Sequence, residues 1–126
     1  MDKLLFEQES YVIRGGCFEV YKQLRNRHKE KVYARALIIY LRKKGLSIEQ
    51  EKQLPIYFDS EKVGVYIPDI IVNGKIFIEL KCKPFITKED KAQFWYYLKA
   101  THFRLGFLIN FGKENGVEII RRVYGE

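Results

Sequence analysis

Cysteine is scarce in this chain of 126 residues, which holds only Cys17 and Cys82. Two cysteines this far apart in sequence are too few to indicate a disulfide framework or a zinc site, so we expect free thiols in a reducing compartment. Histidine is equally rare, with His28 and His102 alone. Neither stands in a spacing that a general base requires, which favours surface or packing roles for both.

Long hydrophobic runs are also missing, and no stretch of the chain is apolar over a membrane-spanning length. The first ten residues, MDKLLFEQES, carry charges within their short apolar piece, so they do not match a signal peptide. These absences predict a cytoplasmic protein with no membrane partner. The length allows one hydrophobic core, and no repeat, low-complexity tract or linker divides it, so we expect residues 1–126 to form a single domain.

Apolar periodicity predicts helices and strands in the order helix, helix, three strands, helix, two strands. The three prolines fit this division, because Pro55 favours an edge strand or a bulge and Pro84 ends a strand. Gly45 is typical of a helix C-cap, and Thr87 with Asp90 resembles a capping box. The expected helices cover residues 6–24, 30–44 and 87–100, and the expected strands cover residues 47–59, 62–72, 75–83, 103–111 and 117–124. Without the first helix and the last strand, the order is αβββαβ, an α/β (α+β) arrangement with a mixed sheet flanked by helices.

Two glycines, Gly15 and Gly16, lie inside the first expected helix. Each costs on the order of 1 kcal/mol relative to alanine in a helix. They indicate either close packing against a neighbouring element or a break in the helix.

Charged side chains interrupt two apolar runs in the stretch PDIIVNGKIFIELKCK, residues 68–83. Side chains alternate between the faces of a strand, so Glu79 and Lys81 share one face and Ile78 and Leu80 alternate around them. A turn at Asn73 and Gly74 folds the preceding strand back and brings Asp69 toward Glu79. Two neighbouring carboxylates repel each other, and Mg²⁺ or Mn²⁺ relieves that repulsion. Lys81 would then orient a metal-bound water or offset charge that develops on a phosphoryl group.

The register of this hairpin determines whether Asp69 and Glu79 can share an ion. A two-residue turn would place Asp69 opposite Ile78, on the wrong face, whereas a three-residue loop or a bulge would place it beside Glu79. The alternative interpretation is a solvated strand face with a surface ion pair.

Positive charge is concentrated in one segment, although the formal net charge of the whole chain is only +7. Residues 22–44 contain nine Lys or Arg against one acid, Glu30. Clustered cations hold phosphates, so the segment predicts a nucleic-acid partner, with an ordinary solvated helix face as the alternative.

The pattern P-D-x9-E-x-K resembles the signature of the PD-(D/E)XK nuclease superfamily, and residues 16–124 resemble the small GxxExxY family within it. The segments that carry the resemblance are GCFEVYKQL, EKVYARALIIYLRKKGL, the PD…ELK block and AQFWYYLKATHFRLGFLINFG. One departure is Arg27, which stands where the family has the glycine of its name. That change concerns the turn ahead of Glu30.

The resemblance implies a restriction-endonuclease-like fold and a metal-dependent nuclease, most directly a deoxyribonuclease. It places the family's glutamate and tyrosine on Glu30 and Tyr33, and its further polar pair on Gln93 and Tyr97. The implied ligands of Mg²⁺ or Mn²⁺ are Asp69, Glu79, the backbone carbonyl of Leu80 and Glu30, with Lys81 as the catalytic lysine. The nucleic-acid contacts expected around this site are Arg25, Arg27, Lys29, Lys31, Arg35 and Lys83.

Two other functions fit the same sequence. One is a non-catalytic nucleic-acid-binding module that uses the basic surface, and the other is an accessory subunit with an exposed apolar patch around Trp95 and Tyr96. A homodimer that spans a duplex is also compatible with so small a domain.

Overall fold

A computed structural model describes residues 5–125 of the chain. Residues 1–4 and 126 lie outside this range. The prediction of one domain over residues 1–126 and the interpretation of the first ten residues therefore fall partly outside the described residues. The helices are α1 (Glu7–Leu24), α2 (Glu30–Lys43) and α3 (Lys88–Ala100). The strands are β1 (Ile48–Glu49), β2 (Leu54–Phe58), β3 (Glu61–Tyr66), β4 (Ile70–Val72), β5 (Ile76–Lys81), β6 (Leu105–Asn110) and β7 (Glu118–Val123).

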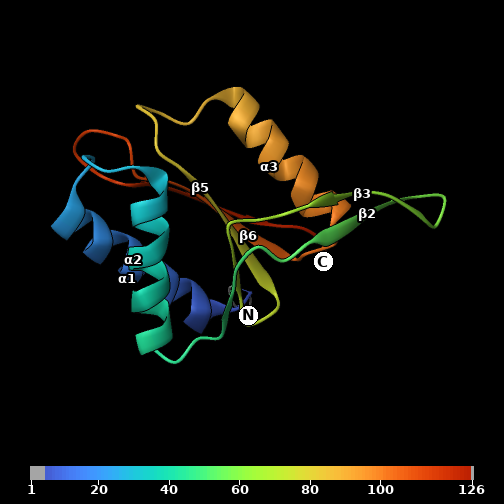
Figure 1. Ribbon diagram of the computed structural model, residues 1–126, viewed down its shortest axis with the longest axis horizontal. Helices are drawn as coiled ribbons and strands as arrows, with labels where there is room; N and C mark the ends of the chain where they lie inside the picture. The colour runs from blue at the N-terminus through green and yellow to red at the C-terminus, as the bar shows by residue number, and fades with distance from the viewer. Residues whose placement is uncertain (1–4, 126) are drawn as a thin grey trace.

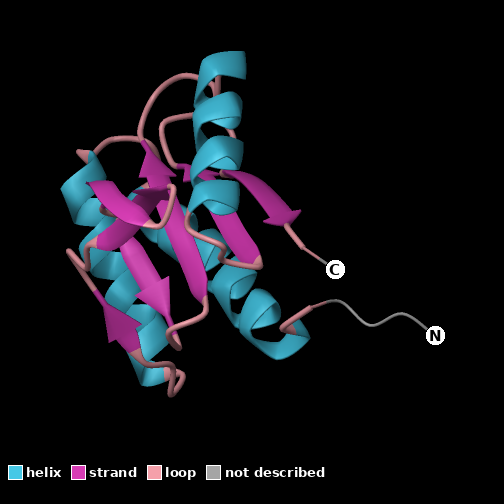
Figure 2. Cartoon of the chain, turned by 90° about the vertical axis from the view of Figure 1, so that its right-hand side faces the viewer, coloured by secondary structure: helices cyan, strands magenta, loops and turns pink. Residues whose placement is uncertain are grey.

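Five of the strands form one mixed sheet in the order β1-β4-β5-β6-β7, in which only β5 and β6 run parallel. Helix α3 connects this parallel pair and lies on one face of the sheet, whereas α1 and α2 cover the other face (Figures 1 and 2). Strands β2 and β3 pair only with each other and extend away from the sheet, to the right in Figure 1. The predicted α/β class with a mixed sheet flanked by helices is therefore confirmed.

Each face of the sheet has its own hydrophobic core. Ile76, Ile78 and Leu80 of β5 pack in the cluster that includes α1 and α2, while Phe77 packs in the cluster that includes α3 and the hairpin. Because side chains alternate along a strand, Glu79 and Lys81 lie on the same face as Phe77. The alternation predicted for β5 is thus present, and it directs both charged residues to the side of α3 and the β2–β3 hairpin.

The predicted strands at residues 47–59 and 62–72 were wrong as continuous units. The first is divided into β1 and β2, and Glu51 between them adopts a positive φ of 57° that interrupts extended backbone. The second is divided into β3 and β4, which belong to different sheets. Pro68 lies at this second division and cannot donate a backbone hydrogen bond to a ladder. Pro55, as predicted, lies in a two-stranded hairpin next to a bulge, which follows Ile56.

The capping predictions hold. Gly45 follows α2 with a φ of +91°, and Thr87 and Asp90 exchange both hydrogen bonds of a capping box at the start of α3. No helix within residues 5–125 has the length and apolar character needed to cross a membrane.

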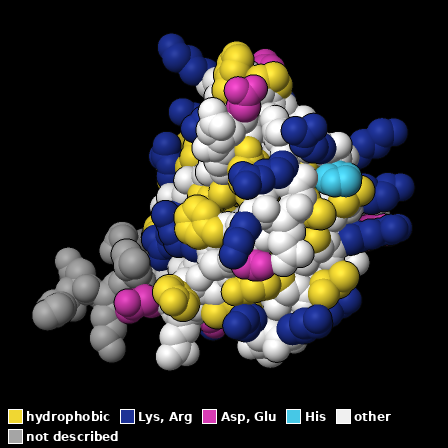
Figure 3. Space-filling view, turned by 90° about the vertical axis from the view of Figure 1, so that its left-hand side faces the viewer, with side chains coloured by type: hydrophobic (Ala, Val, Ile, Leu, Met, Phe, Trp, Pro, Cys, Tyr) yellow, Lys and Arg dark blue, Asp and Glu magenta, His cyan; other side chains and the backbone are white. Residues whose placement is uncertain are grey.

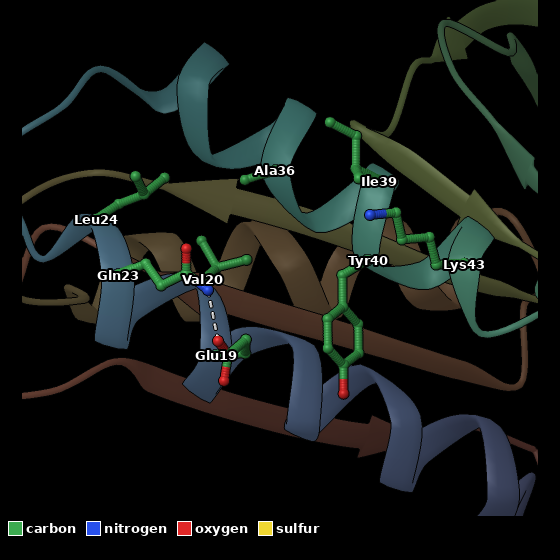
Figure 4. Close-up of a pocket in the computed structure, with 8 residues that line it drawn as sticks. All are labelled: Glu19, Val20, Gln23, Leu24, Ala36, Ile39, Tyr40 and Lys43. Atoms are coloured by element: carbon green, nitrogen blue, oxygen red, sulfur yellow. Dashed lines mark hydrogen bonds between the residues drawn. The ribbon is translucent and has the colours of Figure 1, made fainter.

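Close packing of α1 against α2 accounts for the paired glycines. A Cβ atom on Gly16 would lie 2.8 Å from Cδ1 of Tyr40 and 2.9 Å from Cδ1 of Leu37. Figure 4 shows the Tyr40 ring projecting from α2 toward α1, beside a hollow of about 300 Å³ between the two helices. Helix α1 continues through both glycines without a break, so of the two interpretations close packing is correct.

Candidate functional site

The turn between β4 and β5 sets the register of Asp69, directly before β4, against Glu79 in β5. Asn73 and Gly74 both adopt positive φ, 52° and 67°, and the ladder resumes only with Val72 opposite Ile76. Lys75 is therefore an additional loop residue, and the connection is the three-residue loop that a shared ion requires. Since Ile70 pairs with Ile78, one further step along both strands places Asp69 opposite Glu79.

Hydrogen bonds hold each of these carboxylates by one oxygen. Oδ2 of Asp69 accepts from the backbone N–H of Leu80 at 2.7 Å, and Oε1 of Glu79 accepts from the hydroxyl of Tyr66 at 2.5 Å. Within residues 5–125 the second oxygen of each group has no hydrogen-bond donor. Each carboxylate is thus oriented and still has one oxygen available for a cation.

The electrostatics of the pair show that negative charge is unfavourable there. Burial, and then the nearby charge of Asp69, raise the pKa of Glu79 to about 7. Burial also raises the pKa of Asp69. Lys81 opposes both shifts because its ammonium favours the ionised carboxylates. Groups of this kind are stabilised in their charged form by a bound cation.

Glu30, in the first turn of α2, is a third carboxylate whose charge acts on this pair. Burial raises its pKa, and the charge of Asp69 raises it further. Glu30 and Asp69 open onto one hollow of about 420 Å³. Within residues 5–125, however, no three His, Cys, Asp or Glu side chains are gathered closely enough to form a ready metal cluster. Asp69, directly before β4, and Glu79, on β5, are aligned by the strand register, and Glu30 lines the same hollow as Asp69.

Tyr33 fixes the connection that delivers Glu30. This residue is completely buried and stacks on Phe111 with ring centroids 4.7 Å apart. Its hydroxyl donates to the carbonyl of Arg25 and accepts from the N–H of His28 at 3.1 Å. The backbone there turns through a positive φ of 56° at Arg25. Tyr33 thus spans the turn ahead of Glu30.

Lys81 points into a small ion-pair network at the start of α3. Its Nζ lies 3.9 Å from Oδ1 of Asp90, and Nζ of Lys83 lies 2.8 Å from Oδ2 of the same residue. Burial raises the pKa of Asp90, but hydrogen bonds from Lys83 and Thr87 and the charge of Lys83 outweigh it and hold that pKa at about 2. Lys83 is consequently engaged with Asp90, which makes it less free for the phosphate contact expected from the sequence.

Gln93 and Tyr97 lie on α3 one turn apart, as predicted, but only Tyr97 reaches the carboxylates through a neighbour. Its ring stacks on Tyr66 with centroids 4.0 Å apart, and Tyr66 in turn holds Glu79. Gln93 is exposed to solvent.

Two residues of this arrangement were not expected from the sequence, namely Tyr66 as the donor to Glu79 and Asp90 as the acceptor for Lys81 and Lys83. The sequence indicated only the capping role of Asp90. Tyr66 was visible only as a tyrosine two residues ahead of Pro68, and its contact with Glu79 depends on how the hairpin folds over the sheet.

The expected nucleic-acid contacts other than Lys83 form an exposed basic group at the junction of α1 and α2. All five members of this group are exposed, namely Arg25, Arg27, Lys29, Lys31 and Arg35. In Figure 3, which views the molecule from the left-hand side of Figure 1, Lys and Arg side chains spread over the surface with few acids among them. Lys31 lines the same hollow as Glu30 and Asp69, so the basic group adjoins the carboxylates.

Comparison with known proteins identifies one family. Residues 7–123 match the family described as the PD-(D/E)XK nuclease superfamily, which is nearly the whole described chain. No curated protein and no solved structure gives a significant match.

Proposed function

The chain belongs to the PD-(D/E)XK nuclease superfamily, and from that premise we propose that it is a metal-dependent nuclease that hydrolyses phosphodiester bonds in DNA. The observation that supports this most directly is the alignment of Asp69 with Glu79 beside Lys81. A solvated strand face, the alternative interpretation, would not leave a glutamate with a pKa of about 7 next to a second carboxylate.

The donors around Asp69 and Glu79 fit Mg²⁺ or Mn²⁺. Each carboxylate keeps one oxygen free, and these hard ligands suit cations that retain several waters. The Leu80 carbonyl would be a further metal ligand. The carbonyl of Lys81 accepts from Phe111 on the β6 side, and successive residues of a strand direct their backbone groups to opposite edges, so the Leu80 carbonyl points to the side of Asp69. When bound, such an ion would supply an activated water and neutralise charge on the phosphate.

Lys81 would hold the attacking water in line with the phosphorus and stabilise charge in the transition state. Its side chain lies on the same face of β5 as Glu79, and its ammonium nitrogen lies 3.9 Å from Oδ1 of Asp90. Glu30, on α2, would bind the metal ion directly or through a water molecule. Tyr97, through its stacking on Tyr66, would help to fix the orientation of Glu79, and Gln93 would contact the bound strand.

The exposed basic group at the junction of α1 and α2 would hold the DNA backbone. Such contacts position a nucleic acid without reading its sequence, so they favour cleavage that does not depend on sequence. Because Lys31 borders the same hollow as the carboxylates, a strand held here would lead its phosphates toward Asp69.

We further propose that the chain is a member of the GxxExxY family. This rests on Glu30 at the start of α2 and on Tyr33, whose hydroxyl closes the preceding turn. Arg27 replaces the family's glycine at a position where the backbone does not require positive φ, since Arg25 is the residue in that conformation.

A cleavage assay with the Lys81→Ala variant tests the proposed activity. Single-stranded, duplex and branched DNA would be incubated with the purified chain in Mg²⁺, in Mn²⁺ and in EDTA. We expect metal-dependent cleavage by the wild type and a loss of about 10² to 10³ in rate for Lys81→Ala, the typical effect of removing one such donor. The variant should still bind DNA, because the basic group is unchanged.

The matched control is Lys62→Ala, which removes an exposed lysine from the β2–β3 hairpin and should leave the rate unaltered. Equal metal-dependent cleavage by wild type and Lys81→Ala would remove Lys81 from the mechanism. Salt-dependent DNA binding without cleavage in any metal would favour the non-catalytic binding module.

A further inference from the structure

Helix α1 has a stripe of side chains that the described residues, 5–125, leave exposed. The largest are Tyr11, with 79% of its surface exposed, and Phe18, with 55% exposed. They are seven residues apart, so they lie on the same side of the helix. Glu7, Arg14 and Lys22 are also exposed on this helix.

These five residues form one continuous stripe. At 3.6 residues per turn, positions 7, 11, 14, 18 and 22 fall within an arc of roughly 80°. The centre of the stripe lies between Arg14 and Gly15, which is close to the midpoint of α1. Glu7 and Lys22 are then equally far from the centre on its two sides, and so are Tyr11 and Phe18.

This arrangement is complementary to itself when a second copy approaches in antiparallel orientation. A two-fold axis through the centre of the stripe places Tyr11 against Phe18 of the second copy and Glu7 against Lys22 of the second copy. Arg14 then lies beside Gly15 of the second copy, which has no side chain of its own, although the Tyr40 hydroxyl from α2 lies only 3.2 Å from where a Cβ atom of Gly15 would be. The two copies of Arg14 lie on opposite edges of the stripe, so they do not repel each other directly.

We propose that two copies of this chain associate through α1 in this antiparallel manner. The charges support a second copy as the occupant, because across this two-fold axis the acid at one end of the stripe meets the base at the other end in both symmetric contacts. Neither Glu7 nor Lys22 has an ion-pair partner within residues 5–125. A hollow of about 830 Å³ beside Tyr11 and Arg14 gives side chains of the second copy room to pack. A contact between two helices is small, so we expect a micromolar dimer.

Sedimentation equilibrium of the full chain, over a range of concentrations, tests the proposal with two charge reversals. Glu7→Lys turns both symmetric contacts from attraction to repulsion, and Lys22→Glu does the same. Each variant alone should weaken the dimer about tenfold, from the strength of two exposed ion pairs. An equimolar mixture of the two variants should restore the affinity, because every lysine then faces a glutamate.

Phe18→Ser should abolish the dimer over the same concentrations, whereas the control Ile39→Ser should not. Ile39 is 56% exposed, but it lies on α2, outside the stripe. Circular dichroism of each variant would show that the helices persist. A monomeric wild type at all concentrations would overturn the proposal, and so would a dimer that Ile39→Ser disrupts or a mixture of charge variants that stays monomeric.

Discussion

Substituting Glu79 by glutamine should stabilise the protein at alkaline pH in the absence of divalent cations. The pKa of Glu79 is about 7 in the folded protein against an ordinary value of 4.5. The folded state therefore binds this proton more tightly than the unfolded state does. The stability that comes from the proton is fully present below about pH 4.5 and is lost as the pH rises through 7. Glutamine keeps the oxygen that accepts from Tyr66 but never acquires the charge.

The size of the effect follows from the two pKa values. Their difference corresponds to roughly 3 kcal/mol of unfolding free energy, lost by the wild type between pH 4.5 and pH 8 and retained by Glu79→Gln. For a domain of this length, that is a difference of roughly 10 °C in Tm at pH 8 and almost none at pH 4. Mn²⁺ should reduce the difference in stability between wild type and Glu79→Gln at pH 8, because the ion stabilises the ionised wild-type site and binds the variant more weakly.

Urea unfolding followed by circular dichroism at several pH values, with EDTA and with Mn²⁺, measures these differences. Glu61→Gln is the matched control, since Glu61 is an exposed acid on the β2–β3 hairpin and its substitution should leave the pH profile unchanged. A Glu79→Gln variant that is no more stable than the wild type at pH 8, or whose advantage is the same at pH 4, would refute the electrostatic account of the site.

Three further substitutions test the arrangement around these carboxylates and the packing beneath them. Glu30→Gln should weaken Mn²⁺ binding in calorimetric titration while the fold persists; unchanged affinity would remove Glu30 from the site. Tyr66→Phe deletes the hydroxyl that favours the ionised form of Glu79, so Mn²⁺ should bind about tenfold more weakly at pH 7. Most of the affinity should be recovered at pH 9, where Glu79 is ionised in both proteins, and an equal loss of affinity at both pH values would contradict this account. Gly16→Ala should lower the unfolding free energy by about 1 to 3 kcal/mol, because its Cβ would meet Tyr40 at 2.8 Å, whereas Gly64→Ala, with open space around it, should have little effect.

The tertiary structure alone decided how the predicted strands divide and which side chains meet. A run of extended-looking residues from 47 to 72 carries no signal that assigns its parts to different sheets, because pairing partners are chosen by long-range packing. The chain leaves the main sheet at Glu51 and returns at Ile70, and in between it forms the hairpin that places Tyr66 over Glu79. The hydrogen bond from Tyr66 to Glu79 depends on this placement of the hairpin.

The sequence by itself determined the elements whose physics is local. The strand period placed Glu79 and Lys81 on one face, the capping residues bounded α2 and α3, and the requirement for a three-residue loop followed from counting residues in the hairpin. It could not determine whether that loop would form, since a turn at Asn73 and Gly74 is compatible with either register. The packing of the whole sheet makes this choice, because a slip of one residue would turn Ile70 and Val72 away from the cluster that includes α1 and α2. Their burial in that cluster holds Asp69 opposite Glu79.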